Sequence, residues 1–109
     1  MRNLAFIAAL LLAAGCAKRE VLYLFDGIDF RADTDAPRGD RATFTTTVRD
    51  AGQNVAAAQR AGRYSATQHC VRKLGVSEID WAEASAAAPE TLALAADGTL
   101  VLQGKCVAR

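Results

Sequence analysis

The sequence has little of what identifies the common classes of binding protein. It is 109 residues long and nearly neutral, with 13 basic and 12 acidic side chains and a formal net charge of +1. This length allows one domain at most. So small a charge excludes a basic nucleic-acid-binding protein and an acidic disordered tail. The sequence therefore predicts one folded domain with no nucleic-acid partner.

Residues suited to metal, redox or phosphate chemistry are also scarce. The chain has a single histidine, no Cys-x-x-Cys motif and no glycine-rich phosphate loop. The histidine, His69, directly precedes Cys70, and adjacent helical residues point about 100° apart, so the two make a poor pair of metal ligands. We predict no metal, no cofactor and no catalytic residue.

Five aspartates gather in one stretch of the sequence, at positions 26, 29, 33, 35 and 40. A calcium-binding EF-hand loop needs a glycine at its sixth position and an acid at its twelfth. Counted from Asp33, the sixth position is Arg38. The pattern therefore indicates solvated loop acids and no calcium site.

A small hydrolase is the least favoured functional hypothesis. Ser65 lies one helical turn before His69, but no nucleophile-elbow or comparable signature surrounds it. The aromatic residues Tyr23, Tyr64 and Trp81 are candidates for a small binding groove, although so small a domain needs them first for its core. We expect no enzyme.

The amino-terminal segment has the features of an export signal. Arg2 precedes an apolar run, Leu4–Ala14, and small residues follow that run. Eleven apolar residues are too few to span a bilayer, which takes roughly 20. A positive start, a short apolar core and a small-residue exit are typical of a secretory signal peptide. We predict that residues 1–15 are removed; the alternative is a buried amino-terminal helix.

The residues at the end of this segment, Leu12-Ala13-Ala14-Gly15-Cys16, resemble the lipobox of bacterial lipoproteins. The resemblance implies that Cys16 takes a diacylglyceryl group, that cleavage follows Gly15, and that a fatty acid such as palmitate acylates the new amino terminus. The match departs from the commonest pattern in having alanine, Ala13, three residues before the cysteine. The alternative is an ordinary cut after Ala17, which would release a soluble periplasmic binding module.

Either route places the mature protein outside the cytoplasm. We predict a lipid-anchored protein on the periplasmic side of the cell envelope of a Gram-negative bacterium. Ala17 stands where inner-membrane lipoproteins carry an aspartate, which favours the outer membrane. Residues 16–20 would form the lipidated amino terminus and a short tether, and residues 21–109 the domain. The expected partners are the membrane and a membrane-proximal envelope protein.

The cysteine count becomes even once Cys16 is assigned to lipid. Cys70 and Cys106 remain, and an oxidising compartment favours a disulfide between them. Such a bond would stabilise the domain by roughly 3–4 kcal/mol. The alternative is a redox or metal role for these cysteines.

Hydrophobic periodicity predicts an α+β fold, a mostly antiparallel sheet in the order β-β-α-β-β-β with one helix packed on it and one disulfide. A helical stripe of mostly small residues and one face of the last strand would bring the two cysteines together. The stripe comprises Val55, Ala58, Gly62, Ala66, Cys70 and Leu74, and the face comprises Leu100, Leu102, Gly104 and Cys106. The predicted strands are Val21–Ala32 with a bulge at Asp26-Gly27, Arg41–Arg49, Val76–Trp81, and Thr91–Ala96 joined by an Asp97-Gly98 hairpin to Thr99–Val107; the predicted helix is Gln53–Leu74.

Several short motifs in the mature domain resemble a family of small exported proteins of alphaproteobacteria, many of them lipoproteins. That family has no assigned activity, so the resemblance implies no catalytic residue. It implies only the helix-on-sheet plan and the paired cysteines. The motifs are Phe25-Asp26-Gly27, Phe30-Arg31-Ala32, Ala61-Gly62-Arg63-Tyr64, Ala66-Thr67 with Cys70, Ile79-Asp80-Trp81, and Leu100-Val101-Leu102-Gln103-Gly104-Lys105-Cys106.

Overall fold

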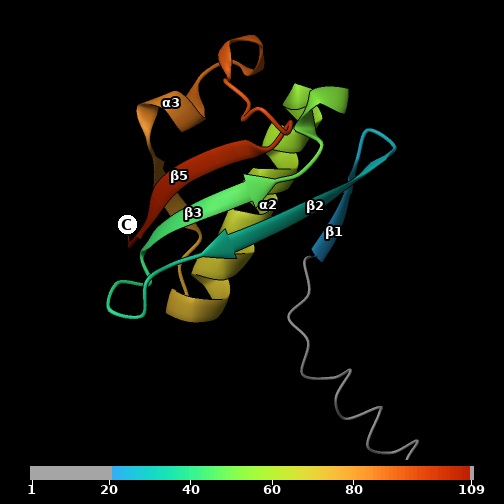
Figure 1. Ribbon diagram of the computed structural model, residues 1–109. Helices are drawn as coiled ribbons and strands as arrows, with labels where there is room; N and C mark the ends of the chain where they lie inside the picture. The colour runs from blue at the N-terminus through green and yellow to red at the C-terminus, as the bar shows by residue number, and fades with distance from the viewer. Residues whose placement is uncertain (1–20, 109) are drawn as a thin grey trace, which may run out of the picture.

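The computed structural model describes residues 21–108 as a five-stranded sheet with one long helix on one of its faces (Figure 1). All neighbouring strands are antiparallel, in the order β1-β2-β3-β5-β4. The strands are β1 (Val21–Phe25), β2 (Ile28–Asp35), β3 (Thr43–Val48), β4 (Glu78–Trp81) and β5 (Leu100–Val107). The helices are α2 (Val55–Leu74) and the short α3 (Glu83–Ala86), with 3-10 turns at Ala51–Gln53 and Pro89–Thr91. The predicted α+β class is confirmed.

The long helix α2 begins and ends where its sequence provides caps. The side chain of Asn54 accepts a hydrogen bond from the backbone N–H of Ala57 at 3.1 Å, which satisfies one of the free donors of the first turn. Gly75 ends the helix in the left-handed region, with φ 71°, and Arg72 and Lys73 suit the negative end of the helix dipole. The predicted and observed bounds differ by no more than two residues.

The buried face of α2 consists of small residues and meets the sheet closely. Ala58, Gly62, Ala66 and Cys70 of the predicted stripe are all buried. A Cβ atom on Gly62 would lie 2.7 Å from Leu102 Cδ1 and 3.0 Å from Val48 Cγ2, distances that a real side chain would have to enlarge. Gly62 therefore permits the close approach of helix and sheet.

Leu74, the last member of the predicted stripe, does not share this burial and is 42% exposed. It occupies the final position of α2, directly before the Gly75 cap. The stripe thus predicts the buried face in the middle of the helix, while Val55 at its start is only partly buried and Leu74 at its end is exposed.

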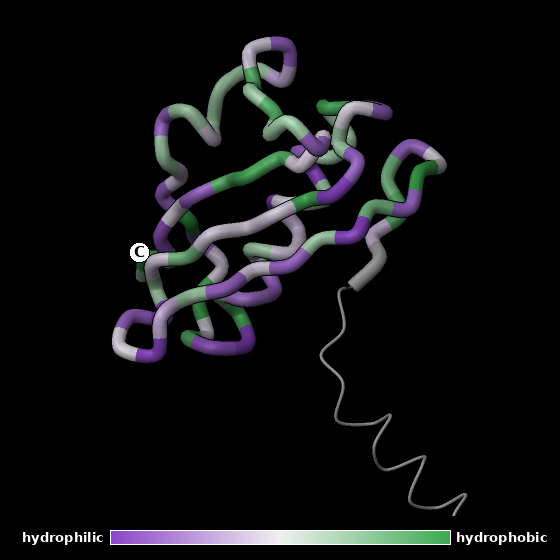
Figure 2. Tube along the Cα trace, viewed as in Figure 1, coloured by the Kyte–Doolittle hydropathy of each residue, from purple (hydrophilic) through white to green (hydrophobic). Residues whose placement is uncertain are grey.

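The prediction of one bulged strand over Val21–Ala32 is wrong. Asp26 and Gly27 have φ of 52° and 77°, and Phe25 pairs with Ile28, so the chain reverses in a two-residue hairpin turn. The reversal changes which residues share a face, because Tyr23 now lies opposite Phe30. In one continuous strand Leu24 would share a face with Ile28 and Phe30; in the hairpin it pairs with Asp29 and is 66% exposed. Figure 2 shows hydrophilic colour at the turn of this hairpin, and hydrophobic and hydrophilic residues following one another along β2.

The predicted strand Thr91–Ala96 is also absent from the described chain. Asp97 and Gly98 do form a turn, with Gly98 N–H donating to Ala95 O at 2.9 Å and Ala95 N–H donating to Thr99 O at 2.8 Å. The segment before this turn pairs with no strand and instead places Leu92 and Leu94 against the core. Asp97-Gly98 therefore predicts the turn correctly, but the turn does not join two paired strands.

The core of the domain divides into two clusters, with Trp81 packed against both. The large cluster lies toward the β1–β2 turn and the start of α2, and the disulfide cluster lies toward the end of α2. The large cluster comprises Tyr23, Phe30, Ala32, Val48, Ala51, Ala57, Ala58, Ala61, Leu100 and Leu102. The disulfide cluster comprises Phe44, Ala66, Cys70 and Cys106.

The predicted Cys70–Cys106 disulfide is confirmed. It joins the last turns of α2 to β5, with the two Cα atoms 5.6 Å apart. Both cysteines are buried. The helix stripe and the strand face that carry them meet as their periodicities predict.

The segment after β4 is fixed to the rest of the domain by buried polar groups. The side-chain amide of Gln59 donates to the carbonyl oxygens of Ser85 and Ala87 at 3.1 and 3.0 Å. The hydroxyl of Ser85 accepts from the N–H of Gln103 at 2.8 Å. These bonds hold α3 against both α2 and β5.

No helix within residues 21–108 is long and apolar enough to cross a membrane.

Candidate functional site: the β2–α2 groove

A hollow with a charged lining lies between the second half of β2 and the carboxyl-terminal half of α2. β1 begins at Val21, opposite Ala32, so within residues 21–108 no strand pairs with this edge of β2 beyond Ala32. Two adjoining cavities of about 300 and 150 Å³ follow the edge. We name them together the β2–α2 groove. Both are lined by Asp33, Thr34, His69 and Lys73.

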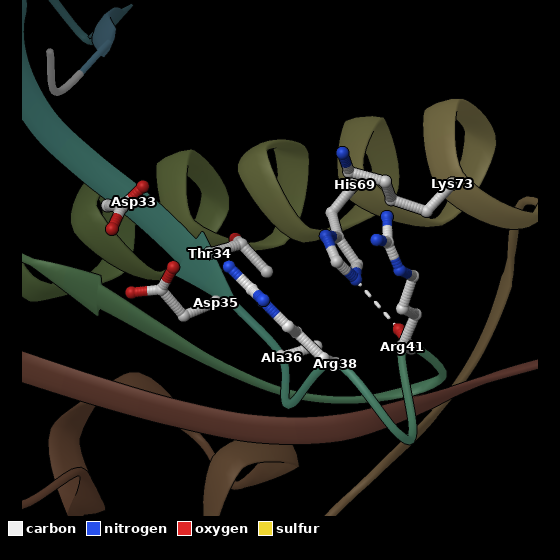
Figure 3. Close-up of a pocket in the computed structure, with 8 residues that line it drawn as sticks. All are labelled: Asp33, Thr34, Asp35, Ala36, Arg38, Arg41, His69 and Lys73. Atoms are coloured by element: carbon white, nitrogen blue, oxygen red, sulfur yellow. Dashed lines mark hydrogen bonds between the residues drawn. The ribbon is translucent and has the colours of Figure 1, made fainter. Parts of the chain in front are cut away.

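The groove carries both signs of charge. Asp33 and Asp35 come from β2, while Arg38 and Arg41 come from the β2–β3 loop. Figure 3 shows the two aspartates toward one end and Arg41, His69 and Lys73 toward the other. Arg38 extends toward Asp35 (Figure 3), so the acidic end of the groove holds a basic side chain as well. Such a lining is suited to a polar ligand.

His69 joins the helix to the loop that faces it. Its Nε2 lies 2.9 Å from the carbonyl oxygen of Arg41 (Figure 3). A carbonyl oxygen can only accept, so Nε2 carries the proton and donates it. The imidazole thus connects the carboxyl-terminal part of α2 to the β2–β3 loop.

Ser65 also lines the groove, and its hydroxyl bonds to the sheet. Its Oγ lies 2.9 Å from Thr34 Oγ1, which lies 2.8 Å from Thr46 Oγ1. These three hydroxyls form a polar chain from α2 through β2 to β3. A hydrolase of the Ser–His type needs the serine hydroxyl to donate to an imidazole nitrogen. In this arrangement Ser65 bonds to the sheet, and His69 bonds to the β2–β3 loop.

The structure does not bring the three aromatic candidates together. Tyr23 and Tyr64 contact each other edge to face, with ring centroids 5.3 Å apart, and the Tyr23 hydroxyl donates to Gln68 Oε1 at 2.7 Å. Trp81 packs instead against Phe44, with centroids 5.5 Å apart. Tyr23 and Trp81 therefore belong to the core, and Tyr64 to the outer side of α2.

The five clustered aspartates divide among the β1–β2 turn, β2 and the β2–β3 loop. Asp26 lies in the β1–β2 turn and forms an ion pair with Arg60. Asp40 Oδ1 accepts from the backbone N–H groups of Ala42 and Thr43, both at 3.2 Å. Hydrogen bonds from Thr43, followed in importance by that from Ala42, lower the pKa of Asp40. Within the described part of the chain no three His, Cys, Asp or Glu side chains are grouped as a metal site.

Sequence reasoning did not find the groove, although it singled out several residues that line it. His69 and Ser65 were considered as a catalytic pair, and Asp33 and Asp35 as calcium ligands. The basic members Arg38, Arg41 and Lys73 gave no signal, because they come from a loop and from a helix end whose proximity depends on the sheet.

Comparisons with known proteins give no relative: no family model, curated protein or solved structure matches the chain. Cys16, the predicted signal peptide and the predicted tether lie outside the described residues. The lipobox and the family resemblance remain predictions.

Proposed function

We propose that the protein is a lipid-anchored cell-envelope protein whose small domain has a structural or interaction role at the membrane surface. The observation that carries the proposal is the buried Cys70–Cys106 disulfide. Structural disulfides form and persist in oxidising compartments such as the periplasm. With these two cysteines joined, the third, Cys16, is left at the end of the predicted export signal.

An interaction role is supported by how the polar residues are used. The hydroxyl of Ser65 bonds to Thr34 and the imidazole of His69 to the Arg41 carbonyl, and both contacts join the helix to the sheet side. Contacts of this kind fix the helix to the sheet and so support a rigid recognition surface.

The test is intact-mass spectrometry of the exported protein, with Cys16→Ser as the matched control. The expected mature chain begins at Cys16 and carries a diacylglyceryl group and an amide-linked fatty acid, and the control lacks both. An unmodified amino terminus at Lys18 would contradict the proposal.

The same sample tests the compartment. Alkylation of the unfolded chain is expected to add two tags to Cys70 and Cys106 only after reduction. Two tags without reduction would contradict an oxidising compartment. Crosslinking in intact cells would then identify membrane-proximal envelope proteins bound to the domain.

The second candidate function is a soluble periplasmic binding module, and the β2–α2 groove is the observation that favours it. Its charged lining is suited to a small polar ligand. This candidate predicts an amino terminus at Lys18 and ligand binding that Lys73→Gln weakens.

A further inference from the structure

The outward face of α2 carries an exposed apolar stripe, which touches β1 only at its Tyr64 end. Tyr64 and Val71 are each 50% exposed, and Leu74 is 42% exposed. With Thr67 they follow the spacing of one helical face. Tyr64, Thr67, Gln68, Val71 and Arg72 enclose a shallow, mainly apolar hollow of about 260 Å³. We name Tyr64, Thr67, Val71 and Leu74 the outer α2 patch.

The charge of α2 is of one sign. The helix contains no aspartate or glutamate, but it contains Arg60, Arg63, Arg72 and Lys73. Arg72 is exposed in the last turn and lines the same hollow as Val71, while Lys73 lines the β2–α2 groove. An exposed apolar stripe bordered by a basic side chain is suited to the interface of an anionic bilayer.

β1, the strand that follows the predicted tether, runs beside this patch. Phe25 contacts Tyr64, and Tyr23, two residues earlier, bonds to Gln68, one helical turn later. β1 therefore runs antiparallel to α2, and its start at Val21 lies toward the last turns of the helix. Cys16 precedes Val21 by five residues, which span at most about 17 Å. A lipid on Cys16 would hold the outer α2 patch close to the bilayer.

We propose that the outer α2 patch lies against the anionic phospholipid surface to which Cys16 is anchored. This inference rests on the proposed lipid anchor and adds an orientation to it. The basic end of α2 faces the lipid headgroups, and the apolar side chains enter the interface. The face of the sheet opposite the helix points away from the membrane.

Two valines provide a matched pair for the test. Val71, on the patch, is 50% exposed; Val101, on β5, is 45% exposed and alternates with the buried Leu100 and Leu102, so it lies on the opposite face of the sheet. Val71→Trp and Val101→Trp would be made in the full-length gene, and the mature lipidated proteins reconstituted in vesicles of phosphatidylethanolamine and phosphatidylglycerol. The unsubstituted protein, with Trp81 alone, gives the background.

Quenching by phospholipids brominated on the acyl chain reports contact with the bilayer. We expect roughly twofold lower emission for Val71→Trp, because interfacial side chains enter about 5–10 Å below the surface. The quenching of Val101→Trp should equal that of the unsubstituted protein. Equal quenching of the two variants, or none at Val71→Trp, would overturn the proposal.

The unsubstituted protein gives a second measurement that no added tryptophan can bias. A photoactivatable phospholipid should label peptides from Tyr64–Leu74 and not those from Leu100–Val107. Labelling confined to β5 would overturn the proposal, as would a crosslinked dimer joined through the patch in place of lipid labelling.

Intact mass of the reconstituted sample separates this inference from the one on which it rests. A chain without acyl groups on Cys16 contradicts the proposed function. An acylated chain with Val71→Trp unquenched contradicts only the orientation.

Discussion

The two halves of the core reach the same degree of burial by different means. The large cluster combines Phe30, Leu100 and Leu102 with five alanines, and it has no covalent crosslink. The disulfide cluster has only four fully buried members, of which two are the bonded cysteines. One half is held by close packing of helix on sheet, and the other by a covalent bond that closes a loop between residues 70 and 106.

The difference shows how a small domain compensates for few large side chains. Alanines and Gly62 let α2 approach the sheet, so that Val48 and Leu102 fill the remaining space. Toward the end of α2, Ala36, Ala42 and Val76 pack only partly buried, and hydrophobic burial is smaller. There the disulfide restricts the unfolded chain, while the large cluster stabilises the folded one.

The largest loss of stability should come from removing the disulfide. Cys70→Ala with Cys106→Ala is expected to lower the free energy of unfolding by about 4 kcal/mol, because the loop it opens spans 36 residues. Urea denaturation of the oxidised, reduced and doubly substituted proteins measures this loss. Equal midpoints for all three would show that the disulfide cluster needs no crosslink.

A smaller effect should come from disturbing the packed half. Gly62→Val introduces a side chain within 3.0 Å of Val48 and Leu102, and overpacking of this kind costs about 1–3 kcal/mol. Gly52→Ala is the matched control, since a Cβ there meets only Leu94 Cδ1, at 3.8 Å. Equal denaturation midpoints for the two variants would mean that the close approach at Gly62 is not what stabilises the large cluster.

The helix start beside the large cluster should contribute less again. Asn54→Ala removes the side-chain acceptor for the Ala57 N–H, a loss of about 1 kcal/mol. Asn54→Asp keeps an acceptor and serves as the control. If thermal unfolding gave the same loss for both, the cap would have no role.

The smallest effect concerns a surface turn in each half. Hydrogen bonds from Thr43 lower the pKa of Asp40, and hydrogen bonds from Thr99 lower the pKa of Asp97. A carboxyl with a lowered folded pKa adds stability above its ordinary value of 3.8 that is lost as pH falls through the folded pKa. Asp40→Asn and Asp97→Asn should therefore have a lower free energy of unfolding than the parent protein at neutral pH. In strong acid the free energies of the variants and the parent should be equal. NMR titration of both carboxyls gives the pKa values directly, and values of 3.8 or above would contradict the prediction.

The two Asp-Gly steps show how far local sequence patterns reach. Asp97-Gly98 is the stronger hairpin signal in the sequence and forms a turn without a hairpin, while Asp26-Gly27 forms a two-residue hairpin turn where the sequence predicts a bulge. Aromatic and branched residues on both sides of Asp26-Gly27 favour pairing. The residues before Asp97 are alanine-rich and follow Pro89, and they pack as an irregular segment.

The β2–α2 groove lies beyond the reach of such patterns. Its charged residues come from β2, the β2–β3 loop and the end of α2, and each group taken alone is an ordinary exposed segment. Within residues 21–108, β1 reaches only to Ala32 along the edge of β2, while α2 continues past it, and the groove lies between that edge and the helix. A strand end and a helix end are set by different local signals, and only their packing brings them together.

The sequence by itself determined the long helix, the alternation of β3 and β5, and the disulfide, because each depends on local periodicity or on a choice with one pairing. Only the tertiary structure decided the face of Leu24, the absence of a strand before Asp97, and the groove. These depend on which strand pairs with which, and pairing is decided by contacts between segments distant in the chain. The same is true of the outer α2 patch, which is exposed because α2 is the one long helix packed on the described sheet.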